Sequence, residues 1–356
     1  MIAAAPVGGT CDAFYDGGMF DPIRIRTAVA CVLGTLRRTV FLPGVWRVAL
    51  PALCVLAPVS HALAIMAGVA PDTPEQRVDA ATPDSAWSGV GAVLVGDSPY
   101  SGVAIGPCHV LTAAHVVGRH PPAELHFAVT LEGPGRVRTM AVERVDVFPD
   151  AAFPYDDLAL LRLEAALPDG VATYPVGDVA LSLGQLIRLA GFGASGHGDA
   201  GPSVAASARV RRLGENVIDA FPLRIGPPTD EARTSRFFLY DFDGPRGRGP
   251  LGGPTLGNAR ESTVAGGDSG SGAFAQIGGR WVLVGINTFA SRTADGARQQ
   301  SIFGSVGGGL LLSDPKTIEW IDRVTEGAAH WASGRSPTPA SSASPPGSPA
   351  PHCAAR

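Results

Sequence analysis

The sequence has few charged residues and no surplus of basic ones. Only 17% of its residues are Asp, Glu, Lys or Arg, and the formal net charge is −4 at pH 7. A protein without a basic surface has little to attract the phosphates of a nucleic acid. The composition therefore argues against a nucleic-acid-binding protein, and we expect no nucleic acid among its partners.

Cysteines and metal-binding motifs are also scarce. The five cysteines, Cys11, Cys31, Cys54, Cys108 and Cys353, are scattered along the chain, and this spacing does not indicate a disulfide framework. Neither a CxxC nor an HExxH motif occurs, although such motifs are typical of zinc sites. We expect no metal site and no cofactor.

The apolar run Val48–Val59 is short and contains two prolines. A membrane-spanning helix needs roughly 20 apolar residues. Arginines precede the run, and the small-x-small sequence Ala62-Leu63-Ala64 follows it, as in a secretory signal. We expect residues 1–64 to be a leader and the mature protein to be secreted, extracellular or periplasmic, with no stable membrane span. A membrane-anchored form is the alternative.

Glycine and proline are abundant, at 46 and 31 residues, and 45% of the chain is hydrophobic. This composition favours short strands and turns around a sizeable core. Apolar runs bounded by turn residues predict strands at Val90–Val95, Gly102–Ile105, Val137–Val147, Leu158–Leu163, Leu186–Gly193, Phe237–Phe242 and Trp281–Ile286. Residues His109–His115 are expected to be a strand that runs into a turn. The rest of residues 194–262 indicates loops. Asp314 followed by a proline predicts the start of a helix that runs to Val324.

Residues 266–272 read Gly-Gly-Asp-Ser-Gly-Ser-Gly, so glycines and an acid surround Ser269. Glycines permit tight turns and close backbone approach. A glycine-rich hairpin turn is the alternative interpretation of this stretch alone. Two upstream stretches favour catalysis, Leu-Thr-Ala-Ala-His at 111–115 and Asp-Asp-Leu-Ala-Leu-Leu at 156–161. Together, in the order His, Asp, Ser, they resemble the trypsin/chymotrypsin-like serine proteases over most of the chain, from about residue 65 to about residue 324.

The resemblance implies an all-β fold. It predicts two antiparallel six-stranded Greek-key β-barrels of the chymotrypsin-like type, followed by a C-terminal α-helix. We place the first barrel at 65–175 and the second barrel with the helix at 176–328. Residues 329–356 are rich in Ser, Pro and Ala, which predicts a disordered tail.

The resemblance also implies a role for each motif residue. Ser269 is the expected nucleophile, and a serine hydroxyl needs an adjacent base to act. His115 is the expected base, and Asp157 is expected to orient it. We choose Asp157 over Asp156 because the family motif has the acid directly before the apolar strand. The backbone N–H groups of Gly267 and Ser269 are expected to form the oxyanion hole.

A cut after Ala64 would expose Ile65, and the new terminus resembles that of active family members. There the terminal ammonium pairs with the acid that precedes the nucleophile, which is Asp268 in this sequence. The pairing is physically reasonable because a buried carboxylate needs a partner. We therefore hypothesise that signal cleavage itself produces the active terminus. An ordinary signal junction followed by a flexible segment is the alternative.

The substrate-binding residues carried over from the family are Thr263, Thr288, Phe289 and Ala290. The resemblance implies that Thr263, a neutral residue, lies at the base of the specificity pocket. The segment 288–290 is expected to pair with an extended substrate, and Ala290 is expected to narrow the pocket mouth. We predict small or medium uncharged side chains at the P1 position.

The sequence departs from the family pattern at several cysteines. Val116 follows the catalytic histidine where a cysteine is common, and Ser101 stands near the usual partner position. The pocket disulfide is missing as well, because Ala265 lies near its site. We therefore expect Cys108 to be a free buried thiol.

These observations predict a secreted serine endopeptidase that acts on proteins or peptides as a monomer. The alternative is a catalytically silent homologue that binds peptides or a protein partner. An α/β-hydrolase does not fit, because Ser271 breaks the Gly-x-Ser-x-Gly motif and the order of the triad residues differs.

Overall fold

The computed structural model describes residues 65–82, 84–133, 136–221, 237–245, 249–291 and 300–336. The predicted leader and its cleavage site lie outside these residues, as does the tail beyond Ser336. The described residues belong to the compact unit that begins near residue 59.

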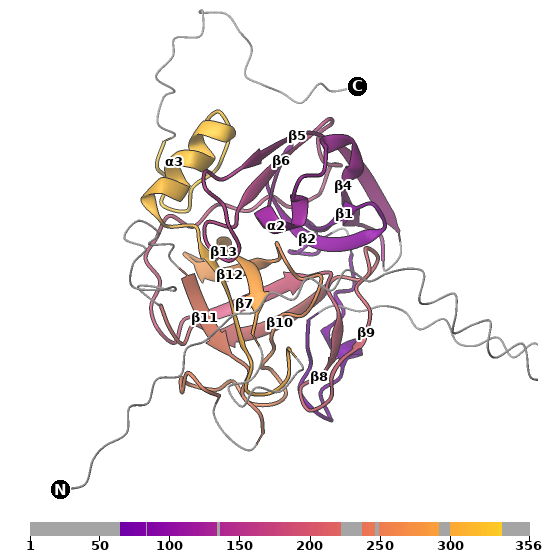
Figure 1. The fold of residues 1–356 in the computed structure, drawn as a ribbon, viewed down its shortest axis with the longest axis vertical. Coiled ribbons are helices and arrows are strands. Elements are labelled where there is room, and N and C mark those ends of the chain that lie inside the picture. The colour runs from indigo at the N-terminus through magenta and orange to yellow at the C-terminus, as the bar shows by residue number, and fades with distance from the viewer. Residues whose placement is uncertain are drawn as a thin grey trace, which may run out of the picture. The chain divides into compact units, whose positions relative to one another are not determined.

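Six antiparallel strands form a closed barrel in the order β1-β2-β3-β6-β5-β4 (Figure 1). Their bounds are β1 (Val90–Val95), β2 (Ser98–Gly106), β3 (His109–Thr112), β4 (Leu125–Thr130), β5 (Val137–Val147) and β6 (Ala159–Leu163). Leu125 of β4 pairs with Val95 of β1, which closes the ring. Closure leaves no unpaired sheet edge in this barrel.

Six further strands form an antiparallel sheet in the order β10-β7-β12-β13-β14-β11. Their bounds are β7 (Leu186–Gly191), β10 (Arg212–Val217), β11 (Phe237–Asp241), β12 (Gly272–Ile277), β13 (Arg280–Ala290) and β14 (Val306–Leu311). The two edge strands, β10 and β11, are not paired with each other. Among the described residues, a single antiparallel β-bridge joins Ala220, which follows β10, to Leu239 of β11. This second sheet is therefore a half-barrel, and a separate hairpin joins β8 (Ser195–His197) to β9 (Gly201–Val204).

Helices are few among the described residues. They are α2 (Ala114–Val117), α3 (Pro315–Val324) and the short 3-10 turns η1 (Pro74–Arg77) and η2 (Pro122–Glu124). The predicted terminal helix is confirmed, since the Asp314 side chain accepts a hydrogen bond from the Lys316 N–H at 3.0 Å. No helix within the described ranges is long and apolar enough to cross a bilayer. The mostly β fold, with a closed barrel, a half-barrel and a C-terminal helix, confirms the predicted fold class.

Several strands were not predicted from the sequence. They are β4, β8, β9, β10, β12 and β14. β14 contains three successive glycines, a composition that disfavours strands. Its position explains them, because a Cβ at Gly309 would lie 2.0 Å from the carbonyl oxygen of Ile286. β10 lies in the segment for which the sequence indicated loops. Its buried Asn216 has hydrogen-bond partners, because the side-chain amide donates to the carbonyls of Asp241 and Ser262.

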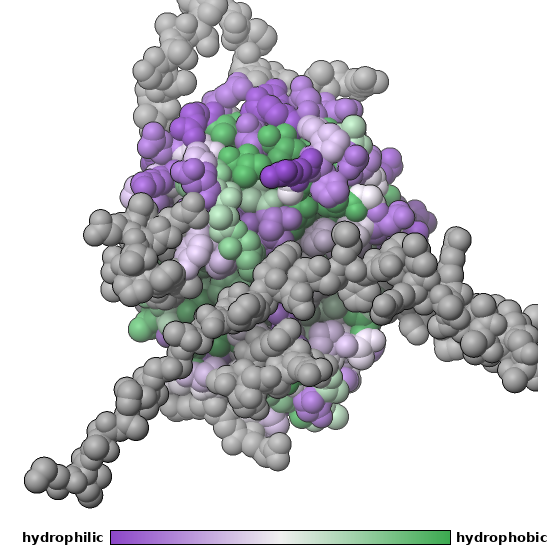
Figure 2. Space-filling model, in the orientation of Figure 1, coloured by the Kyte–Doolittle hydropathy of each residue, from purple (hydrophilic) through white to green (hydrophobic). Residues whose placement is uncertain are grey.

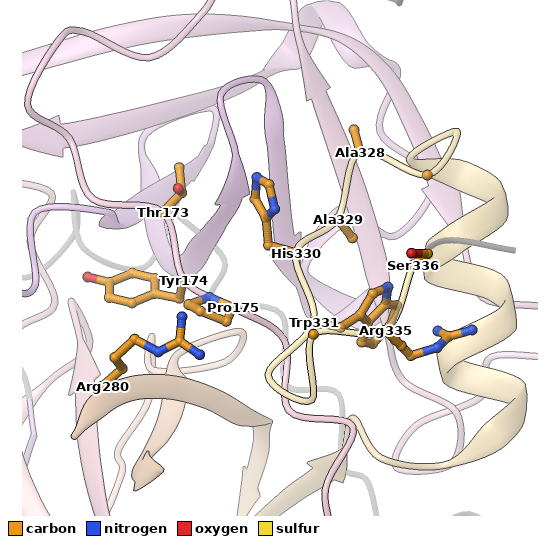
Figure 3. Close-up of a pocket in the computed structure, with 12 residues that line it drawn as sticks. Thr173, Tyr174, Pro175, Arg280, Ala328, Ala329, His330, Trp331, Arg335 and Ser336 are labelled. Atoms are coloured by element: carbon orange, nitrogen blue, oxygen red, sulfur yellow. The ribbon is translucent and has the colours of Figure 1, made fainter. Parts of the chain in front are cut away.

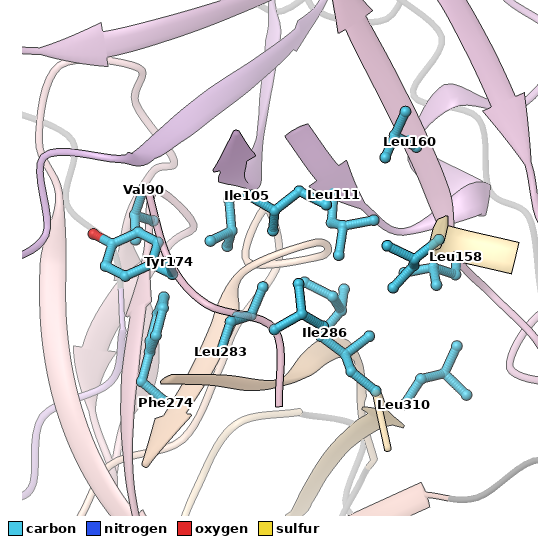
Figure 4. Packing of buried hydrophobic residues seen from close by; sticks show 14 of the residues in the cluster. Val90, Ile105, Leu111, Leu158, Leu160, Tyr174, Phe274, Leu283, Ile286 and Leu310 are labelled. Atoms are coloured by element: carbon cyan, nitrogen blue, oxygen red, sulfur yellow. The ribbon is translucent and has the colours of Figure 1, made fainter. Parts of the chain in front are cut away.

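The two sheets share one apolar core (Figure 4). Val90 and Leu111 of the closed barrel belong to the same buried cluster as Phe274, Leu283 and Ile286 of the second sheet. Each fully buried side chain of this size contributes roughly 1.5–3 kcal/mol by leaving water. On the face shown in Figure 2, polar side chains surround smaller apolar areas.

Segments at both ends of the described unit pack against the second sheet. The N–H of Met66 donates to the Thr263 carbonyl at 3.0 Å, and Val78 bridges to Arg212. Within the region assigned to the tail, Trp331 is buried and bridges to Val176. The residues that precede the first barrel in sequence thus lie against the second sheet.

Candidate active site

Three side chains from separate parts of the chain form one hydrogen-bonded series. Nε2 of His115 lies 2.8 Å from Oγ of Ser269, and Nδ1 of His115 lies 2.6 Å from Oδ2 of Asp157. The Asp157 side chain is 1% exposed, whereas that of His115 is 29% exposed. His115 is thus partly open to solvent, whereas Asp157 is enclosed.

Each of the three residues stands at the end of a regular element. His115 lies on α2, immediately after β3, and Asp157 lies just before β6. β3 and β6 are paired, with Thr112 opposite Ala159, so the turn after one strand lies next to the turn before the other. Ser269 precedes β12 of the second sheet. The site therefore lies where the two sheets meet.

Residues 266–271, called the nucleophile loop below, carry Ser269, the expected nucleophile. Gly267 has φ +91°, a conformation that L-residues other than glycine rarely adopt. The neighbouring amides already donate hydrogen bonds. The Asp268 N–H donates to the Ala265 carbonyl, and the Gly270 N–H donates to the Asn287 carbonyl. The N–H groups of Gly267 and Ser269 make no backbone hydrogen bond among the described residues. Two donors in this loop are therefore available to a ligand.

Ser101 supports the nucleophile loop in a way that the sequence did not reveal. Its N–H donates to the Ser269 carbonyl at 3.0 Å, and its hydroxyl donates to the Gly267 carbonyl at 3.1 Å. The same hydroxyl accepts from the Phe192 N–H at 3.0 Å. The sequence marks Ser101 only as a position where the family often has a cysteine. Hydrogen bonds here join the nucleophile loop to β2 and to the end of β7.

Asp268 is held under the loop by backbone donors. Its carboxylate accepts from the N–H groups of Gly193 at 2.8 Å, Ala265 at 3.0 Å and Ile65 at 3.4 Å. Burial raises the pKa of Asp268 to about 7, and these three hydrogen bonds act in the opposite direction. Ile65 has no exposed surface. The structure therefore brings the predicted pair of Ile65 and Asp268 together.

Of the expected substrate-binding residues, Thr288, Phe289 and Ala290 lie on β13, and Thr263 precedes the loop that carries Ser269. Thr263 and Thr288 are buried, and neither hydroxyl has a partner among the described residues. Phe289 and Ala290 pair with Gly308 and Gly307 of β14. β12 stops pairing with β13 at Ile286, so segment 288–290 has one edge without a strand among the described residues. The edge can accept an extended peptide.

Phe153 flanks the site and was not predicted. Its ring meets the His115 ring edge-on, with centroids 5.2 Å apart, and 47% of the residue is exposed. An exposed aromatic ring beside the base offers an apolar contact to a bound substrate.

The expectation of a free thiol at Cys108 is wrong. Cys108 is disulfide-bonded, and the other four cysteines of the chain lie outside the described residues. The absence of a family disulfide does not by itself leave a cysteine unpaired. Cys108 forms its disulfide with a cysteine that is distant in sequence. The residues around Cys108 give no indication of such a pairing.

Two other features lie apart from these residues. The buried carboxylates of Asp241, Asp243 and Glu261 have oxygens within 4.8 Å of one another, close enough to hold a cation, although backbone N–H groups already donate to each of them. A pocket of about 560 Å³ lies beside Trp331, where Arg335 stacks on the indole ring (Figure 3). None of the three residues of the hydrogen-bonded series lines this pocket.

Comparison with known proteins agrees with the geometry of the site. A model of the trypsin-like peptidase domain matches residues 100–286, a range that includes His115, Asp157 and Ser269. No curated protein matches the chain. The match covers more than half of the sequence, and the chain therefore belongs to the trypsin-like peptidase family.

Proposed function

We propose that this protein is a serine endopeptidase that cleaves peptide bonds through an acyl-enzyme. The observation that carries the proposal is the series Ser269–His115–Asp157, with heavy-atom distances of 2.8 and 2.6 Å. These lengths lie in the range that proton transfer between a nucleophile and its base requires.

In the proposed mechanism Oγ of Ser269 bonds to the scissile carbonyl carbon as its proton passes to Nε2 of His115. Asp157 accepts the Nδ1 hydrogen bond and stabilises the imidazolium. The N–H groups of Gly267 and Ser269 bind the developing oxyanion, and each such donor is worth roughly 3 kcal/mol in the transition state. His115 then gives its proton to the leaving amine as the C–N bond breaks. Water then bonds to the ester carbonyl carbon as its proton passes to His115, and His115 returns that proton to Oγ of Ser269 as the ester C–O bond breaks.

The proposed substrates are proteins or peptides with small or medium uncharged P1 residues. Thr263 supports this preference, because it is neutral and buried, and the resemblance gives it the position at which an acid would be needed to bind a basic side chain. The open edge of segment 288–290 supports binding in an extended conformation. Peptide ester substrates that carry Ala, Val, Phe or Arg at P1 test the preference, and a higher kcat/KM for Arg than for Ala would contradict it.

We also propose that the protein is secreted and is cut after Ala64. The buried position of Ile65 supports this, with its nitrogen 3.4 Å from Oδ2 of Asp268. Ile65 also has φ +58°, an unfavourable conformation for a β-branched residue. A cut before Ile65 removes that constraint, because a terminal residue has no preceding peptide. The new ammonium would then stabilise the Asp268 carboxylate.

Intact mass measured after export from a bacterial host, with and without a fluorophosphonate, tests both proposals. We expect one stoichiometric adduct, lost in Ser269→Ala, on a chain that begins at Ile65. A folded chain that begins at Ile65 and forms no adduct would instead indicate a catalytically silent, peptide-binding homologue. A longer chain without an adduct would indicate a precursor that still needs a cut.

A further inference from the structure

A buried arginine lies in the same part of the second sheet as Asp268. Arg212 has no exposed surface, and Asp268 is 1% exposed. Nε of Arg212 donates to the Pro74 carbonyl at 2.7 Å, whereas Nη1 and Nη2 have no hydrogen-bond partner among the described residues. Burying a guanidinium costs free energy unless an opposite charge is close. Arg212 therefore needs a nearby acid.

The strand register places Arg212 on the face that Asp268 covers. Arg212 of β10 is directly opposite Gly191 of β7, and residues opposite each other in an antiparallel pair project to the same face. A Cβ at Gly191 would lie 2.3 Å from Oδ1 of Asp268. The Asp268 carboxylate thus occupies the space next to the Arg212 side chain.

Ile65 covers the adjoining part of the same face. Gly214 follows Arg212 by two residues along β10, so both project to one side, and a Cβ at Gly214 would lie 2.7 Å from Cγ2 of Ile65. Arg212, Asp268 and Ile65 therefore lie together over one region of β7 and β10.

The charges in this region complement one another. Burial raises the pKa of Asp268, the three backbone hydrogen bonds lower it, and Arg212 lowers it further by a smaller amount. Burial lowers the pKa of Arg212 to about 9, and Asp268 and Glu75 act in the opposite direction. Burial raises the pKa of Tyr240 on β11, and the charge of Asp268 raises it further. Arg212 is thus cationic at neutral pH, and the buried acid that raises its pKa is Asp268.

We propose that Arg212 is a positioning residue for the nucleophile loop. Its charge stabilises the Asp268 carboxylate, and through it the Gly267–Ser269 loop, whether or not Ile65 carries a free ammonium. The catalytic consequence rests on the proposed function: the terminal ammonium strengthens a loop conformation that Arg212 already supports. A precursor with an uncut terminus then retains part of its activity.

The first test is a double-mutant cycle in a Ser269→Ala background, which needs no activity. Unfolding is measured for Arg212→Met, Asp268→Asn and the double variant. We expect strong coupling, with the double variant more stable than the sum of the single effects predicts, because it leaves neither charge buried alone. The double variant also keeps the test valid if Arg212→Met alone does not fold. Additive effects would overturn the proposal.

The second test compares kcat in four chains, with a native Ile65 terminus or one extra residue before it, and with Arg212 or Arg212→Met. A nearby guanidinium favours the ionised form of a carboxyl group, and a pKa difference of about 1 changes the ionisation equilibrium tenfold. We therefore expect the extra residue to lower kcat at pH 7 about tenfold more in Arg212→Met than with Arg212 present. KM should change little, and Arg212→Lys should restore part of kcat.

Arg211→Met is the matched control, because Arg211 is the adjacent residue, is equally buried and pairs with Asp79 instead. Arg211→Met should lower the unfolding free energy. It should not change the ratio of kcat between the chain that begins at Ile65 and the chain with one extra residue. Equal behaviour of the Arg211 and Arg212 variants would contradict the proposal. If the native chain has no activity at all, the proposed function fails, and the stability cycle alone decides whether Arg212 and Asp268 are partners.

Discussion

Asp157 holds His115 through both of its carboxylate oxygens. Oδ1 accepts the backbone N–H of His115 at 2.7 Å, and Oδ2 lies 2.6 Å from the ring Nδ1. The first bond fixes the backbone of the base, and the second fixes the orientation and tautomer of its ring. One buried acid therefore sets both the place and the protonation pattern of the imidazole.

This arrangement predicts a large effect of Asp157→Asn. The amide can keep the geometry but can donate to Nδ1, which favours the wrong tautomer of His115. In the well-studied enzymes of this family the same change lowers kcat roughly 10⁴-fold, and we expect a similar loss against a peptide ester. Asp156→Asn is the control, because Asp156 is outside the hydrogen-bonded series. Equal losses in both variants would contradict the assignment of Asp157.

Gly267→Ala should disrupt the oxyanion hole. The residue has φ +91°, and an added Cβ would lie 2.9 Å from Cβ of Ala206 and 3.0 Å from Cα of Gly193. Loss of one donor lowers kcat roughly 10²–10³-fold, so kcat measured at saturating substrate should fall by that order. Gly278→Ala is a matched control, since Gly278 also has positive φ but nothing within 4 Å. It should cost stability and leave kcat unchanged.

Ser101→Ala should weaken both folding and catalysis. The change leaves the Phe192 N–H and the Gly267 carbonyl without a buried partner, which costs about 1–3 kcal/mol. Because Gly267 is a proposed oxyanion donor in the nucleophile loop, we also expect a lower kcat. Ser88 is a comparison residue, since its buried hydroxyl accepts from the Ala172 N–H at 2.8 Å. Ser88→Ala should lower the unfolding free energy only, and a normal kcat in Ser101→Ala would show that the loop does not depend on Ser101.

The stability of the uncut chain should fall as the pH rises from about 4 to about 7. The pKa values of Asp268 and Asp219 are both raised from 3.8 to about 7, chiefly by burial. In this window the folded state binds more protons than the unfolded state, so the unfolding free energy decreases with increasing pH. A pKa difference of about 1 between the folded and unfolded states corresponds to about 1.4 kcal/mol.

Chemical denaturation of the uncut Ser269→Ala chain at pH 5 and pH 7.5 measures this slope. Asp268→Asn should reduce it, because the amide does not titrate. A chain that begins at Ile65 should also show a smaller slope, because the ammonium favours the ionised carboxylate. A slope that Asp268→Asn leaves intact would assign the effect to other groups.

The proposed cut after Ala64 also predicts which cysteine is the disulfide partner of Cys108. If the chain is cut after Ala64, Cys353 is the one other cysteine left in it, so peptide mapping without reduction should find Cys108 linked to Cys353. Removing a native disulfide typically costs about 2–5 kcal/mol, and Cys108→Ser should lower the melting temperature. A linkage to Cys11, Cys31 or Cys54 would contradict the proposed cut.

The sequence by itself determined the features that depend on short stretches. His115, Asp157 and Ser269 each lie in a motif where neighbouring residues carry the signal, and Asp314 with Pro315 marks a helix start by local hydrogen bonding. Strands such as Val90–Val95 and Val137–Val147 were predicted because apolar runs between turn residues need no distant partner to be visible.

Only the tertiary structure decided the features that depend on distant neighbours. The glycines of β14 make a strand because Ile286 and its neighbours leave no room for side chains. Ser101 supports the nucleophile loop because folding brings residues 101, 192 and 267 together. The environment of Arg212 depends on a strand register that places it opposite Gly191 and beside Asp268. Burial and pairing of this kind arise from contacts between segments far apart in the chain, and no local pattern encodes them.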